Sequence, residues 1–391
     1  MSQVYSPCPS STAFRYAALN DILGETVYSL ATMDRREFLQ LSLGAVAASA
    51  QPQQQPPSPI PRLRDLALSR SLFFGTAVSD SQLHRLDFTP LFLDQCSVLV
   101  PENQMKWTAT HPEPDRFDFT QADFFANFAE SNHLLMRGHN LCWHEHNPPW
   151  LEQTITPQNA AKIFTNHIRT VVSRCQGRIH SWDVVNEAVR PEHHNHHDLT
   201  TSIWLTKIGE GYIELAYRTA SDADPNALLT YNDFDIETDA HDQQQKREAV
   251  LALLRRLKSK GIPLHALGIQ AHLRTNKGTP TFTQLPKFLK EIEKLDLQVF
   301  ITELDVDDQF LPADIPERDR QVADLYRSFL STVLPHNSVK AVLTWCLSDR
   351  DSWLQHFRPR KDGLPQRPLP FDADLNPKPA FFALRDAFAS K

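Results

Sequence analysis

Residues 179–187 read Ile-His-Ser-Trp-Asp-Val-Val-Asn-Glu, a short run rich in β-branched and aromatic residues that ends in an amide and a carboxylate. Such a composition predicts a buried strand over Ile179–Val185. A second strand is predicted at Gln298–Thr302, and Glu303 follows it in the same way. An apolar core cannot hold an unpaired charge, so both carboxylates are expected at the open end of a sheet.

Short apolar runs of this kind alternate with amphipathic helical stretches from residue 70 to residue 391. The predicted strands are Leu72–Val78, Ser97–Pro101, Leu134–Gly138, Ile179–Val185, Leu228–Asn232, Ala266–Gln270, Gln298–Thr302 and Ala341–Trp345. The predicted helices are Gln121–Ser131, Gln158–Arg174, Ile203–Ser221, Gln243–Ser259, Leu285–Lys294, Arg318–Leu334 and Lys378–Ala389. The connection after the first strand has no clear pattern.

This alternation predicts an α/β fold, a (β/α)8 TIM barrel that forms a single catalytic domain over residues 63–391. Strands separated by helices pair in parallel, and eight such units suit a closed barrel. An open doubly wound sheet is the alternative. The sequence contains neither a GxGxxG nor a GxxxxGK[ST] phosphate-binding motif, which argues against that alternative.

Polar and aromatic residues gather where the predicted strands end. In a TIM barrel this end of the strands carries the active site. The residues, in chain order from the second strand to the eighth, are Glu102, Asn103, His139, Trp143, Asn186, Glu187, Asn232, Asp233, Gln270, His272, Glu303, Asp305 and Trp345.

Glu187 and Glu303 are the predicted catalytic pair. Glycoside hydrolysis uses two carboxyl groups that flank one glycosidic bond. The fourth and seventh strands are expected to face each other across the mouth of the barrel, which would bring both side chains to one bond. Alternatively, each is an ordinary strand-end acid that caps the next helix. The occurrence of both, among the other polar residues, favours catalysis.

The two segments resemble glycoside hydrolase family 10 xylanases, which carry a Trp-Asp-Val-Val-Asn-Glu strand and an Ile-Thr-Glu-Leu-Asp strand. The resemblance covers roughly residues 65–388. Further matching segments follow in the same order, at residues 101–107, 138–144, 268–273, 344–353 and 371–380. The resemblance implies a retaining endo-1,4-β-xylanase on a TIM barrel, with Glu187 as general acid/base and Glu303 as nucleophile. It implies no cofactor.

The resemblance also implies roles for the supporting residues. Asn186 matches the residue that hydrogen-bonds the 2-hydroxyl of the attacked sugar, and Gln270 would neighbour the acid/base. His272 would link Glu303 to Asp305. Two aromatic walls would come from Trp345 and Trp353. The residues that match those holding the sugar on the non-reducing side of the cleaved bond are Glu102, Asn103, Lys106, His139 and Trp143.

Two departures from the family pattern would alter substrate contacts. Phe234 stands where the family commonly has Tyr, which would remove one contact to a substrate hydroxyl. Residues 144–149 read His-Glu-His-Asn-Pro-Pro and differ from the usual His-Ser-Gln run.

A cluster of histidines, His193, His194, His196 and His197, looks like a metal site. Free loop histidines at irregular spacing are more often solvated, so the sequence predicts no functional metal there.

The cysteines that would remain after removal of the N-terminal segment are Cys96, Cys142, Cys175 and Cys346. Their even number permits disulfides, but no CxxC pair occurs, and buried free thiols are favoured.

The overall composition fits a neutral partner. The formal net charge is −7 and the pI about 6.2, whereas nucleic-acid and anionic-membrane partners need a clustered basic surface. No run of 18 apolar residues predicts a membrane span. We expect a monomer that acts on a polysaccharide, xylan, and we expect Trp107, Trp182 and Trp204 to belong to the core.

Residues 33–50 resemble a twin-arginine signal peptide. Arg35 and Arg36 precede a short apolar run, and residues 48–50 read Ala-Ser-Ala, a typical cleavage site. The sequence therefore predicts an exported protein, periplasmic or secreted. A signal works at the N-terminus, so residues 1–32 are expected to be an upstream extension with a misassigned start. Residues 51–62 form a Pro/Gln-rich linker.

Three other functions fit parts of the pattern. The first is a retaining cellulase or mixed-linkage glucanase, whose cleft has room for the C6 hydroxymethyl group of glucose. In a xylanase, Lys106, Trp143 and Trp353 would exclude that group. A noncatalytic, exported sugar-binding barrel would not need both Glu187 and Glu303. A metal-dependent hydrolase on the same barrel would lose activity with a chelator.

Overall fold

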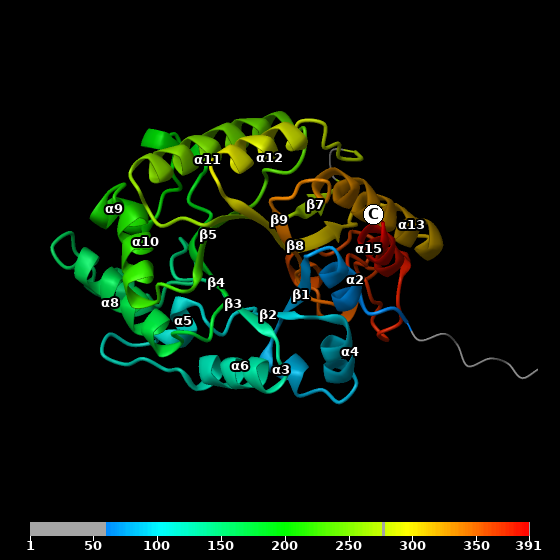
Figure 1. The fold of residues 1–391 in the computed structure, drawn as a ribbon, viewed down its shortest axis with the longest axis horizontal. Coiled ribbons are helices and arrows are strands. Elements are labelled where there is room, and N and C mark those ends of the chain that lie inside the picture. Colours follow the sequence, from blue (N-terminus) through cyan, green and yellow to red (C-terminus); the bar gives the residue numbers. More distant parts are fainter. Residues whose placement is uncertain (1–59, 276–277, 391) are drawn as a thin grey trace, which may run out of the picture. The chain divides into compact units, whose positions relative to one another are not determined.

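Eight parallel strands close into a barrel in the computed structural model, and helices surround it (Figure 1). The structure describes residues 60–275 and 278–390. The predicted upstream extension, signal peptide and most of the linker lie outside these residues. The first element among the described residues is the helix α2 (Leu63–Ser69), which starts at the predicted start of the domain.

The barrel confirms the predicted TIM-barrel fold. Neighbouring strands pair in the order β6-β5-β4-β3-β2-β1-β9-β8, and β6 pairs with β8 to close the ring. The strands are β1 (Phe73–Val78), β2 (Val98–Pro101), β3 (Leu135–Gly138), β4 (Ser181–Asn186), β5 (Leu228–Asp233), β6 (Ala266–Ile269), β7 (His272–Arg274), β8 (Gln298–Asp307) and β9 (Val339–Thr344).

The helices lie between successive strands on the outside of the barrel (Figure 1). They are α2 (Leu63–Ser69), α3 (Asp80–Leu83), α4 (Phe88–Gln95), α5 (Trp107–Thr110), α6 (Thr120–Ser131), α7 (Pro149–Thr154), α8 (Ala160–Arg174), α9 (Ile203–Ile208), α10 (Tyr212–Ala223), α11 (His241–Ser259), α12 (Leu285–Lys294), α13 (Ile315–Val333), α14 (Leu354–Phe357) and α15 (Pro379–Ala389). Three short 3-10 turns are η1 (Pro191–His193), η2 (His196–Asp198) and η3 (Asp349–Asp351).

Two apolar cores hold the barrel together, one on each side of the strands. On β2, Val98 and Val100 point into the barrel, where they join Phe300 and Trp345, whereas Leu99 packs outward against the helices. The alternation follows from the two-residue period of a strand. The helices complete the outer core with apolar stripes; on α12, for example, Leu285, Phe288, Leu289 and Ile292 are buried.

Strand β8 is longer than predicted. The prediction ended at Thr302, but β8 continues to Asp307 because His272–Arg274 form an extra strand, β7, that pairs with Asp305–Asp307. Glu303 and Asp305 therefore lie within a strand rather than after it.

The order of the strands around the barrel also corrects the expectation that the two carboxylate-bearing strands, β4 and β8, face each other. Only β5 and β6 separate β4 from β8, and the strand opposite β4 is β9.

The predicted helix over 203–221 is two helices. Gly209, with φ +87°, interrupts it and separates α9 from α10. Such a positive φ favours glycine, which has no Cβ to clash. The connection after the first strand, which had no clear pattern, contains α3 and α4.

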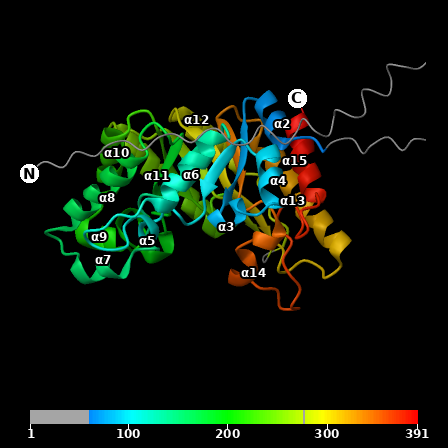
Figure 2. The ribbon, with the colours of Figure 1, turned by 90° about the horizontal axis from the view of Figure 1, so that it is seen from below.

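The predictions about core residues are confirmed. Trp107, Trp182 and Trp204 are buried, and Cys96, Cys142, Cys175 and Cys346 are buried free thiols. Among the described helices, none combines the length and apolar character needed to span a bilayer. The short helices α7, α9 and α14, which follow β3, β4 and β9, lie along one side of the barrel, opposite α2 (Figure 2). That side is the carboxyl-terminal rim.

Candidate active site

The carboxyl ends of the strands surround a cleft of about 520 Å³. All of the site residues predicted from the sequence line this cleft except Asp305, which lies behind it in contact with His272 and Trp353. The structure thus brings the predicted set together. Other lining residues are Glu145, His146, Arg190, Phe234, Arg274 and Phe357.

Glu187 is the first residue after β4, and its backbone adopts the left-handed region with φ 57°. This conformation is uncommon for a residue with a side chain and persists only where the surroundings hold it. Here the Glu187 N–H donates to the carbonyl of Asn232, and Thr200 Oγ1 donates to the Glu187 carbonyl at 2.7 Å. The strand end therefore turns sharply and directs the carboxyl group into the cleft.

Three side chains hold the Glu187 carboxyl group. Trp143 Nε1 donates to one oxygen at 2.8 Å. Gln270 Nε2 and Asn186 Nδ2 donate to the other at 2.9 and 3.0 Å. Burial raises the pKa of Glu187, and the nearby charges of Asp233 and Glu303 raise it further, against the opposing effect of the Gln270 and Trp143 hydrogen bonds. This carboxyl group is therefore disposed to carry a proton.

Glu303 lies inside β8 and is buried. Asn232 Nδ2 donates to one of its oxygens at 2.8 Å, and His272 Nε2 lies 3.2 Å from the other. Burial alone would raise the pKa of Glu303, but the hydrogen bond and charge of His272, with help from His139 and Asn232, hold that pKa below its ordinary value. Glu303 is therefore disposed to be ionised.

His272 owes its charge to Asp305. Its Nδ1 lies 2.9 Å from Asp305 Oδ1, while Trp353 Nε1 donates to the other Asp305 oxygen at 2.8 Å. Burial lowers the pKa of His272, but the two carboxylates, Asp305 first and Glu303 second, more than offset this and raise the pKa to about 10. An imidazolium between two carboxylates fixes the orientation of Glu303.

Asn232 connects the two carboxyl groups; the sequence placed it among the strand-end residues but gave it no role in the site. Its Nδ2 donates both to Glu303 and, at 2.8 Å, to Asn186 Oδ1, and Asn186 in turn donates to Glu187. Thr302 Oγ1 donates to Asn232 Oδ1 at 2.7 Å. The sequence signal was present, because Asn232 ends the fifth predicted strand, but that position alone did not show which way its amide points.

The wall formed by the second and third strand ends is held by charge and ring contacts. Lys106 Nζ donates to Asn103 Oδ1 at 2.8 Å and lies 5.0 Å from the ring centre of Trp143. Burial lowers the pKa of Lys106, and the surrounding carboxylates oppose that shift. His139 Nδ1 lies 2.9 Å from Asp183, which also forms a buried ion pair with Arg137. These contacts fix polar atoms towards the cleft, where sugar hydroxyls can bind them.

Both departures from the family pattern lie on the cleft wall. His146 stacks on Trp143 with ring centres 5.2 Å apart, and burial lowers its pKa to about 4, so the imidazole is neutral. Phe234 lies beneath two cations, Lys246 Nζ at 3.6 Å from its ring centre and Arg190 at 5.4 Å. Lys246 also pairs with the buried Asp233 at 2.7 Å. The wall near Phe234 is therefore cationic and aromatic.

The cleft therefore offers one carboxyl group disposed to donate a proton and one disposed to act as an anion, with aromatic and polar walls for a sugar chain. Among the described residues, those that could hold a metal ion are His196, His197 and Glu210, and none of the three lines the cleft.

The chain is similar to known proteins over most of its length. The sequence profile of Glycosyl hydrolase family 10 matches residues 62–387. "Endo-1,4-beta-xylanase B" of Thermotoga neapolitana is 35% identical over 296 residues, which cover 75% of this chain and 81% of the relative. "Beta-1,4-xylanase" of Dictyoglomus thermophilum is 32% identical over 355 residues, 89% of this chain and 95% of the relative.

A solved xylanase structure has a similar fold. The crystal structure of xylanase 10B from Thermotoga petrophila RKU-1 in complex with xylobiose matches with a TM-score of 0.75 and 32% identity, and covers 84% of this chain and 97% of that one. The likeness therefore extends over nearly the whole of that structure.

Proposed function

The chain belongs to glycosyl hydrolase family 10 and is an endo-1,4-β-xylanase, and we propose that it cleaves internal linkages of xylan with retention of anomeric configuration. One observation carries this mechanism. Glu187 and Glu303 line the same cleft, and their pKa values shift in opposite directions. Double displacement needs this division between an acid and an ionised nucleophile.

In the first step, a Glu303 carboxylate oxygen attacks the anomeric carbon and forms an ester bond to it. The bond from that carbon to the leaving oxygen breaks, and Glu187 gives its proton to this oxygen. His272 remains charged at neutral pH because its pKa is about 10, so it holds the second Glu303 oxygen throughout. We expect Asn186 to bond the 2-hydroxyl of the attacked sugar, a contact that strengthens towards the oxocarbenium-like transition state.

In the second step, water displaces Glu303. Formation of the ester removes the Glu303 charge, which is one of the causes of the raised pKa of Glu187. Glu187, now deprotonated, takes a proton from the water as the oxygen attacks the anomeric carbon. Glu303 leaves as a carboxylate, and the product has the configuration of the substrate.

A neutral pentose chain suits the walls of the cleft. Trp345 and Trp353 offer apolar faces to the C–H groups of a sugar ring, while Glu102, Asn103 and Lys106 offer hydrogen-bonding atoms to its hydroxyls. We propose that Lys106, Trp143 and Trp353 leave no room for the C6 hydroxymethyl group of a glucan. Selectivity for xylan over cellulose would follow from this exclusion.

Product analysis tests the proposed function. The purified protein is incubated with xylan, with cellulose and with mixed-linkage glucan, and the anomers released first are identified by proton NMR. Xylo-oligosaccharides released as β-anomers are expected. Release of α-anomers would contradict the retaining mechanism, and preferential cleavage of cellulose would contradict the substrate. Glu303→Gln separates catalysis from mere sugar binding, because this variant should bind xylo-oligosaccharides without hydrolysing them.

The twin-arginine-like segment supports a further proposal, that the protein is exported and acts in the periplasm or outside the cell. We also propose that it acts as a monomer. Replacement of both Arg35 and Arg36 by Lys should leave the xylanase activity in the cytoplasmic fraction. Activity that reaches the medium or periplasm undiminished would contradict this route. Light scattering of the purified protein tests the monomer.

A further inference from the structure

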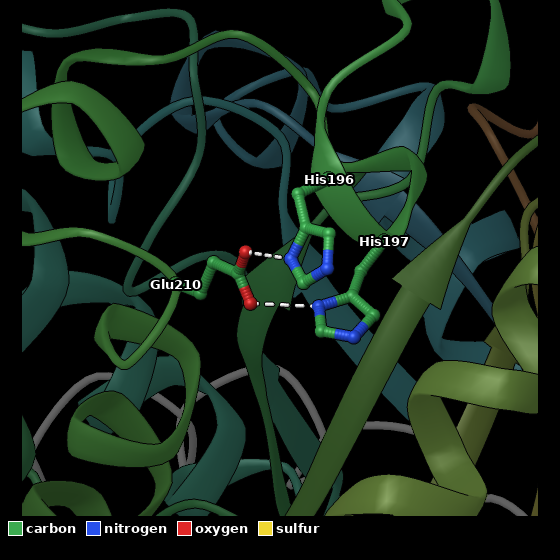
Figure 3. Close-up of side chains that lie close together, drawn as sticks. All are labelled: His196, His197 and Glu210. Atoms are coloured by element: carbon green, nitrogen blue, oxygen red, sulfur yellow. Dashed lines mark hydrogen bonds and ion pairs between the residues drawn. The ribbon is translucent and has the colours of Figure 1, made fainter.

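The loop that follows Glu187 brings two of its histidines to one carboxylate. His196 Nδ1 hydrogen-bonds to Glu210 Oε1, and His197 Nδ1 lies 2.7 Å from Glu210 Oε2 (Figure 3). The two imidazole rings lie with their centres 3.8 Å apart. One ligand atom from each of the three residues lies within 4.8 Å of the others. The irregular spacing of the histidines in the sequence concealed this convergence, which depends on Glu210 from a separate segment.

We propose that His196, His197 and Glu210 bind one divalent transition-metal cation of the Zn²⁺ class. Two imidazole nitrogens and one carboxylate oxygen are a ligand set that Zn²⁺ and its first-row neighbours accept. Ca²⁺ and Mg²⁺ prefer oxygen ligands throughout, so the two histidines select against them. The three residues supply three protein ligands, and water would fill the remaining coordination positions of the metal.

The surroundings of Glu210 leave space for that water. Glu210 stands in the break between α9 and α10, with Gly209 before it and Gly211 after it. Beyond the adjacent residues of the chain, no atom lies within 4 Å of the position that a Cβ would take at either glycine. The side chains of His196, His197 and Glu210 are 75%, 41% and 36% exposed, so a cation and its waters can reach all three.

The charge of the site also suits a cation. The hydrogen bonds and charges of the two histidines, that of His196 foremost, lower the pKa of Glu210, so this carboxylate is ionised at neutral pH. A neutral imidazole can move its proton from Nδ1 to Nε2, which frees Nδ1 to bind the metal while Nε2–H faces water.

A metal at this site would connect the loop after β4 to the start of α10. The loop is joined to the barrel through Thr200, whose N–H donates to the Ala188 carbonyl at 2.8 Å and whose hydroxyl donates to the Glu187 carbonyl. None of the three ligands lines the cleft. Metal binding is therefore expected to raise thermal stability and to leave the chemistry at Glu187 and Glu303 unchanged, so the inference does not rest on the proposed function.

Calorimetric titration with ZnCl₂ tests the site. The full chain, prepared without a histidine tag and dialysed against a chelator and then buffer, should bind one Zn²⁺ per chain at neutral pH. Glu210→Gln and His197→Asn should each weaken binding by at least about tenfold. Asn is chosen at position 197 because His197 has φ 58°, a conformation that Asn tolerates. His194→Asn is the matched control, because His194 lies in the same loop with φ 53° and outside the group of three.

Thermal unfolding gives a second readout. Added Zn²⁺ should raise the Tm of the unsubstituted protein and of His194→Asn, since a ligand that binds only the folded state stabilises it, and should leave the Tm of Glu210→Gln unchanged. Equal xylan hydrolysis by all variants in chelator shows that each is folded. The proposal is overturned if the protein shows no saturable binding, or if His194→Asn loses as much affinity as the two ligand variants.

Discussion

Glu187 and Glu303 have the same side chain in the same cleft, but their surroundings shift their pKa values in opposite directions. Among the described residues, the side chains that donate to Glu187 are neutral, namely Trp143, Gln270 and Asn186, and burial, with the charges of two carboxylates, raises its pKa. Glu303 contacts the charged His272. The assignment of acid and nucleophile therefore depends on these contacts rather than on the glutamates themselves.

The loss of activity caused by replacing Glu187 should depend on the leaving group of the substrate, whereas the loss caused by replacing Glu303 should not. Glu187→Ala removes the proton donor, which should slow xylan hydrolysis by about 10²–10⁴-fold and slow the cleavage of an aryl xylobioside with an acidic phenol far less. Glu303→Ala removes the nucleophile and should be inactive on both substrates. Steady-state kinetics with both substrates measures the effect. Equal inactivity of the two variants on the aryl glycoside would contradict these roles.

The pH dependence of kcat/KM should report the same pair. Activity should rise as pH rises through the pKa of Glu303 and fall as pH rises through the pKa of Glu187, which gives a bell-shaped profile. His272→Asn removes the cation that lowers the pKa of Glu303. The acidic limb should therefore move to higher pH and narrow the bell. An acidic limb that stays in place would show that His272 does not set the charge of Glu303.

At the scale of elements, close packing between β5 and β6 positions the amide that links the two carboxyl groups. A Cβ on Gly268 of β6 would lie 2.2 Å from Asn232 Oδ1. Only glycine leaves this space, so the strand pair sets the position of Asn232 and, through it, those of Asn186 and Glu303.

Gly268→Ala should displace the Asn232 amide and lower kcat while the protein remains folded. Loss of a positioning contact of this kind typically lowers the rate by about 10–100-fold, because small displacements of reacting groups are costly. Gly211→Ala is the control, since this N-cap residue of α10 has helical dihedral angles and, beyond the adjacent residues of the chain, no atom lies within 4 Å of the new methyl. Xylan kinetics and circular dichroism would be compared. A Gly268→Ala variant with full kcat would show that Asn232 does not hold the pair.

Elements with strong periodicity could be predicted from the sequence, and those set by neighbours could not. Leu285–Lys294 was predicted with the boundaries that α12 has, because its apolar stripe is regular. The extension of β8 to Asp307 depends on pairing with β7, which no local pattern reveals. The continuous helix predicted over residues 203–221 was wrong because a single glycine, Gly209, ends α9.

At the scale of the whole molecule, the two ends of the barrel sequence meet. Strand β1 pairs with β9, and the first and last described helices, α2 and α15, pack together. Arg70 Nη1 donates to the Ala387 carbonyl at 2.7 Å, and the rings of Phe74 and Phe388 contact edge to face with centres 5.8 Å apart. The closing helix therefore stabilises the ring of strands without touching the cleft.

Phe388→Ala should lower the free energy of unfolding by about 3–5 kcal/mol, because it removes a buried ring and leaves a cavity. Phe388 is 1% exposed, whereas Phe382 on the same helix is 36% exposed, so Phe382→Ala is the control and should cost far less. Denaturant unfolding measures the difference. The KM for xylan should be unchanged in both variants, and similar losses of stability would contradict the closing role of Phe388.

Some of the residues that line the cleft could be predicted from the sequence, and others could not. Residues at strand ends could be placed on one rim, because parallel strands of a barrel end together. Residues on irregular or additional short segments could not. Arg190 in the loop after β4, Arg274 on the extra strand β7 and Phe357 on the short helix α14 line the cleft, and Glu210 meets the loop histidines. These contacts join segments that the sequence separates by unpatterned connections.

Trapping of the covalent intermediate tests the central claim most directly. A 2-deoxy-2-fluoro-xylobioside with a dinitrophenyl leaving group forms the glycosyl-enzyme but hydrolyses slowly, since fluorine destabilises the oxocarbenium-like transition states. Mass spectrometry of the digested protein should find one fluoroxylobiosyl group, on the peptide that carries Glu303. A modified Glu187, or release of dinitrophenol at turnover with no adduct on any peptide, would contradict double displacement through Glu303.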